Sequence, residues 1–198
     1  EISTRLVGSE MCIRDRPGCY PTASILGLLP VIPHLQKNSK IILDAKSGIS
    51  GAGRSSVENG LEEDIKENFK SYNVGFHRHQ PEIKDFLKME FNLDHEIIFI
   101  PHLLPLFRGE YVTLYCEVSQ NDLDINELYE SYYEKHKLVR VKEKGEIAEI
   151  KEVINTFYCD ISVSYAFQSN TIIVNSAIDN LLKGAASQAI QCLDIMSS

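Results

Sequence analysis

Residues 16–30 read RPGCYPTASILGLLP and place a cysteine where a turn gives way to an apolar stretch. Pro21 is tolerated only near the start of a helix, and the apolar residues after it follow a helical period. The stretch therefore predicts a helix that begins near Cys19 and ends before Pro33. The first N–H groups of a helix lack intrahelical partners and favour negative charge nearby. We accordingly expect Cys19 to have a lowered pKa and to act as a nucleophile; a small buried apolar side chain is the competing interpretation.

The whole chain has the composition of a soluble globular protein with one good core. Its 198 residues are 43% hydrophobic and 24% charged, and no stretch approaches the length of a membrane span. A formal net charge of −8 argues against nucleic acid and favours a small-molecule or protein partner. The five cysteines are scattered and form no CxxC pair, so neither a disulfide framework nor a zinc site is indicated. This cysteine usage fits the reducing cytoplasm.

Periodicity and turn signals predict mixed helices and strands after Pro33. Strands are expected at 40–46, 95–103, 110–119, 137–144, 158–167 and 171–177. Helices are expected at 57–70, at 124–136 and at 177–196, and a further helix after the segment 71–83 is expected to end near Phe91. In 110–119, Thr113, Tyr115 and Glu117 alternate with apolar residues, as in a half-exposed strand. These elements predict an α+β fold with helices on one face of a mixed, largely antiparallel sheet.

A glycine-rich loop, SGISGAGR at 47–54, follows the first of these strands. Its glycines match neither the dinucleotide-binding nor the P-loop pattern. The loop still offers backbone N–H groups, Ser47, Ser50 and Arg54 to an anion or a flat ring. A tight surface turn is the alternative interpretation.

The segment HRHQPEI at 77–83 carries two histidines around Arg78. In an extended segment both imidazoles would point to one side, and a neutral imidazole can take a thiol proton. Metal binding is disfavoured because the sequence places no third ligand. Arg108, just before a strand, can bind a carboxylate or phosphate, or form an ordinary surface salt bridge.

Six stretches, taken together, resemble one enzyme family. They are PGCYPTASILGLLP, IILDAKSGISGAGR, YNVGFHRHQPEI, PHLLPLFRG, ELYESYY and AIDNLLKGAASQAIQ. In this order and spacing they are similar to the C-terminal part of N-acetyl-gamma-glutamyl-phosphate reductase, from Pro17 nearly to the last residue. The resemblance implies a domain like the C-terminal domain of glyceraldehyde-3-phosphate dehydrogenase-type enzymes. It also implies NADPH-dependent reduction of N-acetyl-γ-glutamyl phosphate to the semialdehyde, in arginine biosynthesis.

The resemblance also implies roles for individual residues. Cys19 would attack the acyl phosphate to give a thioester, and His77 would be the acid–base group. The substrate side would comprise His79, Arg108, Tyr72, Ser47 and Gly48, and the nicotinamide of NADP(H) would lie near Ser50, Gly51 and Asn180. The implied partners are the acyl phosphate and, in the full-length enzyme, further copies of the chain. Nucleic acid and membranes are not expected partners.

The sequence departs from the family pattern in several places. Ala148 stands near a position where proline is common, and Phe157 stands where asparagine is expected. Residues 1–16 resemble a non-native leader, and 17–198 the catalytic and dimerisation domain. The family's N-terminal Rossmann domain is expected before Pro17, so we interpret the chain as a fragment without reductase turnover. The alternatives are an aspartate-semialdehyde dehydrogenase-like enzyme and a non-catalytic interaction domain.

Overall fold

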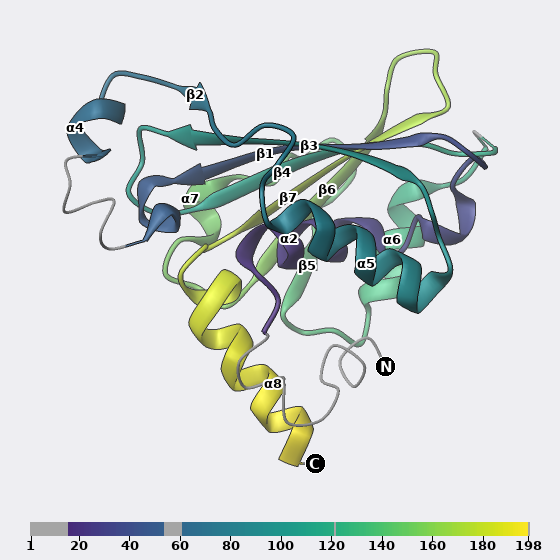
Figure 1. Cartoon of the computed structure of the whole chain (residues 1–198). Coiled ribbons are helices and arrows are strands. Elements are labelled where there is room, and N and C mark those ends of the chain that lie inside the picture. Colours follow the sequence, from purple (N-terminus) through teal and green to yellow (C-terminus); the bar gives the residue numbers. More distant parts are fainter. Residues whose placement is uncertain (1–15, 54–60, 121, 198) are drawn as a thin grey trace.

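The protein is built around one mixed seven-stranded sheet (Figure 1). The computed structural model describes residues 16–53, 61–120 and 122–197. The strands are β1 (Lys40–Gly48), β2 (Lys70–Ser71), β3 (Glu96–Leu104), β4 (Glu110–Glu117), β5 (Val139–Val141), β6 (Cys159–Tyr165) and β7 (Thr171–Ile178), in the order β2-β3-β1-β4-β7-β6-β5. The β1–β3 and β5–β6 pairs are parallel and the other pairs antiparallel. The predicted α+β class with a largely antiparallel sheet is confirmed.

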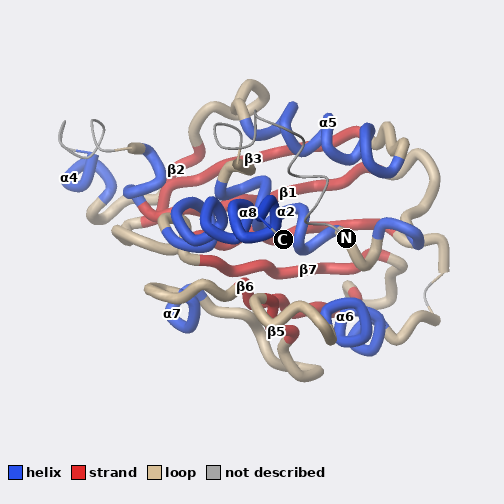
Figure 2. Tube along the Cα trace, turned by 90° about the horizontal axis from the view of Figure 1, so that it is seen from below, coloured by secondary structure: helices blue, strands red, loops and turns tan. Residues whose placement is uncertain are grey.

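The main helices lie on one face of this sheet. The α-helices are α2 (Cys19–Leu28), α4 (Glu62–Ile65), α5 (His79–Phe91), α6 (Ile125–Tyr133), α7 (Ile150–Val153) and α8 (Ser187–Ser197). Short turns of other helix types are η1 (Ile32–His34), η2 (Ile49–Ala52) and the π-type η4 (Leu182–Ala186). Figure 2 shows α2, α5, α6 and α8 in front of the strands, with α8 over α2. None of the helices in the described ranges has both the length and the apolar character needed to cross a membrane.

Helix α2 is the centre of the core, which explains why its sequence is apolar on nearly every side. It packs on β4 and β7 and is covered from outside by η4. Gly27 allows close approach, because a Cβ there would lie 2.9 Å from a methyl of Leu114. The buried Tyr129 of α6 donates to the Gly27 carbonyl at 2.6 Å, which fixes α6 against α2. The predicted start at Cys19 is confirmed.

Three predicted elements differ from the structure. Of the helix expected at 57–70, residues 57–60 lie outside the described ranges, and the described part contains only the single turn α4. The strand expected at 137–144 is reduced to β5. The helix expected at 177–196 is wrong at its start, because β7 continues to Ile178. Asp179 then caps the next turn by accepting the N–H groups of Leu181 and Leu182.

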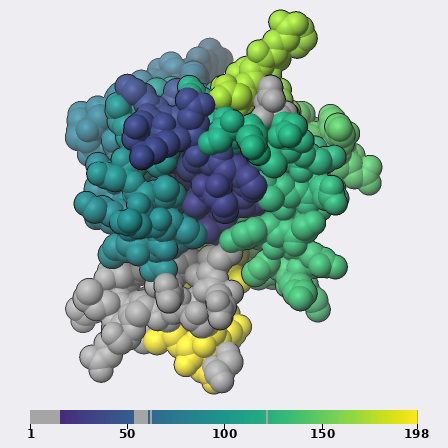
Figure 3. Space-filling model, turned by 90° about the vertical axis from the view of Figure 1, so that its right-hand side faces the viewer, coloured from purple at the N-terminus to yellow at the C-terminus, as the bar shows by residue number. Residues whose placement is uncertain are grey.

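The face of the sheet opposite α2 is largely open. One row across it joins Ile98, Ile42, Tyr115 and Ile173, which are in register on β3, β1, β4 and β7 and half-buried. Part of this face, near Ala177, is covered by a small cluster that includes residues 148 and 153 of the α7 segment. The β6–β7 hairpin projects from the body of the protein (Figure 3), with Phe167 90% exposed.

The two departures from the family pattern lie in the α7 region. Ala148 is buried, and its N–H donates to the Ser162 hydroxyl at 3.0 Å. Phe157 is 54% exposed. Of residues 1–16, only Arg16 is described, and its guanidinium donates to the Gly184 carbonyl at 3.1 Å. The expected leader otherwise lies outside the described ranges.

Candidate active site

Cys19 is the first residue of α2, as predicted, but its thiol is not activated in the expected way. The N–H groups of Tyr20 and Cys19 lower the pKa of the thiol, in line with the helix-start argument. Burial and the carboxyl group of Glu110 act in the opposite direction and are stronger, so the pKa is raised well above its usual value. The expectation of a lowered pKa is therefore wrong. Activation of Cys19 requires a proton acceptor.

Glu110 was not predicted as a site residue, but its carboxyl group interacts with the Cys19 thiol. It is the first residue of β4, is fully buried, and is in register with Ser47 on one side and Ile178 on the other. Burial raises its pKa to about 8, while hydrogen bonding from the Cys19 thiol lowers it. Neither carboxyl oxygen has a hydrogen bond of good geometry within the described residues. The sequence did contain a signal for Glu110: in a strand it points to the same side as residues 112, 114 and 116, which are buried, so its charged side chain is placed in the interior.

The two histidines lie close together beside the start of α2. They do not lie together in an extended segment as expected: His77 follows the turn at residues 74–76, and His79 begins α5. Both are buried, and their ring centroids are 4.8 Å apart. Burial, then the charge of Arg78, lowers the pKa of His77, and burial, then His77, lowers the pKa of His79 to about 3. Both imidazoles are therefore neutral at pH 7.

The hydrogen bonds of His77 determine which of its nitrogens carries the proton. The His79 N–H donates to His77 Nδ1 at 3.2 Å. In the neutral ring the proton is therefore on Nε2, which can donate a hydrogen bond. His79 Nε2 lies against Gly18, where an added Cβ would be only 2.4 Å away, and His79 Nδ1 is buried without a hydrogen-bond partner among the described residues.

Tyr72 joins this group through its ring. Its ring centroid is 5.4 Å from that of His77, and its hydroxyl lies 3.5 Å from the hydroxyl of Tyr20. Burial raises the pKa of Tyr72 to about 12, so the phenol keeps its proton and can act as a donor. The structure thus brings Tyr72, His77 and His79 together around Tyr20, the residue next to Cys19.

The residues expected near the nicotinamide form a second group, which is held together by its own hydrogen bonds. The Asn180 amide donates to Ser50 Oγ at 2.9 Å and accepts the Gly109 N–H at 2.8 Å. Gly51 must be small, because a Cβ there would lie 2.6 Å from Ser47 Oγ. The Gly48 N–H donates to the Gly109 carbonyl at 2.8 Å. The two groups meet at β1 and β4, where Ser47 is in register with Glu110.

Arg108 forms a salt bridge with Asp179, so the alternative that its guanidinium pairs with a carboxylate of the protein applies. Its Nη1 donates to Asp179 Oδ2 at 3.2 Å and to Asn155 Oδ1 at 3.0 Å. Asp179 is fully buried, while the Arg108 side chain is 30% exposed. Arg108 therefore anchors the end of β7 and still presents part of its guanidinium to solvent.

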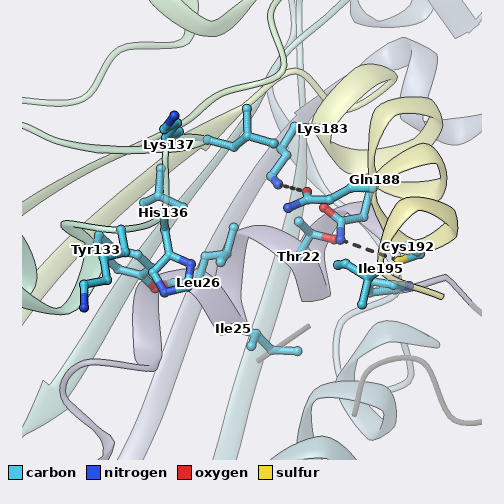
Figure 4. A pocket seen from close by; sticks show the side chains of 15 residues that line it. Thr22, Ile25, Leu26, Tyr133, His136, Lys137, Lys183, Gln188, Cys192 and Ile195 are labelled. Carbon is cyan, nitrogen blue, oxygen red and sulfur yellow. Dashed lines mark hydrogen bonds between the residues drawn. The ribbon is translucent and has the colours of Figure 1, made fainter. Parts of the chain in front are cut away.

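A cavity of about 270 Å3 lies elsewhere, between α2, the α6–β5 loop and α8 (Figure 4). Basic side chains from the loop line it, together with the buried Lys183, which donates to Gln191 Oε1 at 2.7 Å. None of the predicted site residues lines this cavity. The candidate active site is therefore the region around Cys19 and Glu110.

Curated relatives match most of the chain. An N-acetyl-gamma-glutamyl-phosphate reductase of Thermoanaerobacter sp. (strain X514) is 43% identical over 190 residues, which cover 94% of this chain and 55% of the relative. One from Geobacillus sp. (strain WCH70) is 44% identical over 186 residues, covering 92% and 54%. The chain thus spans about half the length of these relatives, and the resemblance inferred from the sequence is confirmed.

Solved structures with the same fold have much lower sequence identity. Aspartate semialdehyde dehydrogenase II of Vibrio cholerae matches with a TM-score of 0.73 and 15% identity, covering 91% of this chain and 61% of that one. A probable aspartate-semialdehyde dehydrogenase of Pseudomonas aeruginosa has a TM-score of 0.75 and 14% identity, covering 92% and 61%. A family model described as "Semialdehyde dehydrogenase, dimerisation domain" matches residues 19–180. The chain therefore belongs to the semialdehyde dehydrogenase family.

Proposed function

We propose that this chain is the catalytic half of an enzyme that reduces N-acetyl-γ-glutamyl phosphate to the semialdehyde through a thioester on Cys19. The observation that carries the proposal is the place of Cys19, at the start of α2 beside a buried carboxyl group and two neutral imidazoles. The names of the relatives support the choice of substrate. Such a biosynthetic reaction belongs in the cytoplasm.

In this proposal each residue near Cys19 has a defined task. Cys19 Sγ attacks the acyl carbon, and the N–H groups at the start of α2 stabilise negative charge that develops there. His77, with its proton on Nε2, is the acid–base group and donates to the acyl oxygen. His79, Tyr72 and the exposed part of Arg108 position the substrate, with Ser47 and Gly48 below it.

NADPH is the proposed cofactor, and it supplies the hydride when bound. The described residues fit only its nicotinamide end: Ser50 Oγ accepts from Asn180 and keeps its own O–H for a ligand, and Gly51 leaves the approach open. The Asn180 amide is already engaged with Ser50 and Gly109. We therefore expect the chain alone to form the thioester without steady reduction, because contacts to the rest of the cofactor are lacking in the described residues.

The proposal predicts stoichiometric phosphate release. Mixed with N-acetyl-γ-glutamyl phosphate and no cofactor, the chain should release about one equivalent of phosphate and gain the acyl mass on Cys19. Cys19→Ser should slow this release by about 100-fold or more, because a hydroxyl is a far weaker nucleophile. Cys192→Ser, in α8, is the matched control. Equal release from the Cys19→Ser variant would refute the proposal, and faster release from aspartyl phosphate would favour the aspartate-semialdehyde alternative.

We also propose that a second copy of the chain is its partner, through the open face of the sheet. The family model is described as a dimerisation domain. The row of Ile98, Ile42, Tyr115 and Ile173 offers a continuous apolar surface in the middle of that face. Two such faces can pack as self-complementary surfaces related by a twofold axis.

This arrangement predicts that charge in the row separates the subunits. The 22.4 kDa chain should sediment at twice its mass, and Ile173→Lys should shift it to the monomer at micromolar concentration, because a lysine would be buried unpaired. Met89→Lys is the control, since Met89 is 75% exposed on α5, on the other side of the sheet. A dimer that persists in Ile173→Lys would place the contact elsewhere.

A further inference from the structure

Glu110 is a buried acid that has no role in the proposed function. Its side chain lies on the helix side of the sheet, in phase with Val112 and Leu114, and is fully buried. Neither carboxyl oxygen has a hydrogen-bond partner of good geometry among the described residues. An unsatisfied buried carboxyl group lowers the stability of the fold, so stability does not explain why Glu110 is buried here.

The group that Glu110 faces is Cys19. The Cys19 Cβ and the Ile178 side chain both lie against Gly184, where an added Cβ would be 2.6 Å from Cys19 Cβ and 3.3 Å from Ile178 Cδ1. Glu110 is the first residue of β4 and pairs in register with Ile178, which makes it a neighbour of this contact. Besides burial, the charge of Glu110 also raises the pKa of three other titratable groups, Tyr20, Tyr72 and Cys159. Burial raises the pKa of each, so these three stay protonated near neutral pH.

The imidazoles leave the role of thiol base open. His77 Nδ1 already accepts the His79 N–H, and Nε2 of the neutral ring carries a proton. His79 Nε2 is in contact with Gly18. Glu110 is thus the acid that interacts with the Cys19 thiol, and its oxygens have no other hydrogen-bond partner among the described residues.

We propose that Glu110 is a catalytic residue that takes the thiol proton of Cys19 during acylation and passes it to the departing phosphate. The inference rests on the proposed function. As Sγ attacks, the S–C bond forms, the C–O bond to phosphate breaks, and the phosphate leaves with that electron pair. The thiol proton moves to a Glu110 oxygen and from there to the phosphate, which leaves as hydrogen phosphate. Glu110 returns to the carboxylate, so protons and electrons balance.

This role makes acylation depend on pH. Burial raises the pKa of Glu110 to about 8, so its basic form increases as the pH rises to that value. Acylation should accelerate up to about pH 8 and then level off. Iodoacetamide alkylates the thiolate of Cys19, which forms when the thiol loses its proton to solvent and does not need Glu110 as the base. Alkylation should also level off above pH 8, because ionised Glu110 opposes the thiolate.

The test compares the wild-type chain with Glu110→Gln, which keeps the shape of the side chain and removes its basicity. Phosphate release from N-acetyl-γ-glutamyl phosphate in a single turnover should fall about 100-fold. Alkylation of Cys19 at pH 7 should change by about twofold at most, since a neutral acid and an amide affect the thiolate alike. Above pH 8, alkylation of Glu110→Gln should keep rising. Glu117→Gln, at the exposed end of β4, is the control and should match wild type.

The outcomes separate this inference from the function on which it rests. Wild-type release of phosphate with an equal rate in Glu110→Gln overturns the inference alone. If the wild type releases no more phosphate than Cys19→Ser, the proposed function fails and the inference with it. A parallel loss of acylation and of alkylation at pH 7 would indicate a collapsed site and would also overturn the assignment.

Discussion

Glu110→Gln should make the folded chain more stable at neutral and alkaline pH, by about 3 kcal/mol at pH 7 and about 4 kcal/mol at pH 8. The pKa of Glu110 is about 8 in the folded chain, against an ordinary value of 4.5. Well below pH 4.5 the acid is protonated in both the folded and the unfolded state, so its titration contributes nothing to the pH dependence of stability. As the pH rises from 4.5 to 8, the unfolded chain releases this proton and the folded chain holds it, so stability falls.

Urea denaturation of both proteins between pH 5 and pH 8 measures this effect. The difference in the free energy of unfolding should grow from about 1 kcal/mol at pH 5 to about 4 kcal/mol at pH 8, because glutamine does not titrate. Glu117→Gln, which removes an exposed carboxylate from the same strand, should show a nearly constant difference of about 0.5 kcal/mol or less. A constant difference for Glu110→Gln would mean that Glu110 is ionised in the folded chain at neutral pH.

Such a gain in stability would link Glu110 to function in a second way. A residue that weakens the fold while lying against the reacting sulfur fits the general trade between stability and activity at enzyme sites. Glu110→Gln should therefore be more stable and slower in acylation. Either change without the other would separate the structural role of the residue from its chemical role.

The sequence was a good guide to the elements and a poorer guide to the electrostatics. Helix α2 and the longer strands were predictable, because Pro21 marks a helix start and apolar residues 112, 114 and 116 alternate with 113, 115 and 117 along β4. The start of the last helix was mispredicted because the apolar pattern continues through Ile178 into the turn. Asp179 was the available signal, since aspartate is a strong N-cap residue.

The site was predictable only as far as local sequence reaches. The position of Cys19 at a helix start follows from its neighbours, and the resemblance supplied candidate partners. The pKa of Cys19 depends on Glu110, which is distant along the chain and comes close only when β4 pairs with β1 and β7. Arg108 is a similar case, because its pairing with Asp179 also depends on strand ends meeting in the folded sheet.

Asp160→Asn should lower the free energy of unfolding by about 2–3 kcal/mol. Asp160 is fully buried in β6, and its carboxylate accepts from Arg140 Nε at 2.6 Å and Nη2 at 2.8 Å. Lys142 Nζ lies 3.2 Å from the same carboxylate. An amide cannot balance these two cations. The loss should be smaller than for a fully enclosed pair, because the Arg140 side chain is 41% exposed.

Glu96→Gln provides the matched comparison, because its ion pair with Lys40 joins side chains that are 61% and 57% exposed. That change should cost about 0.5 kcal/mol or less, since water solvates both charges once the pair is broken. Urea denaturation at pH 7 measures both variants. Arg140 and Asp160 are directly in register, so their ion pair supports the pairing of β5 with β6 at the edge of the sheet. Asp160→Asn should therefore also speed amide hydrogen exchange in β5, and equal losses of stability in the two variants would show that burial adds nothing to the Asp160 pair.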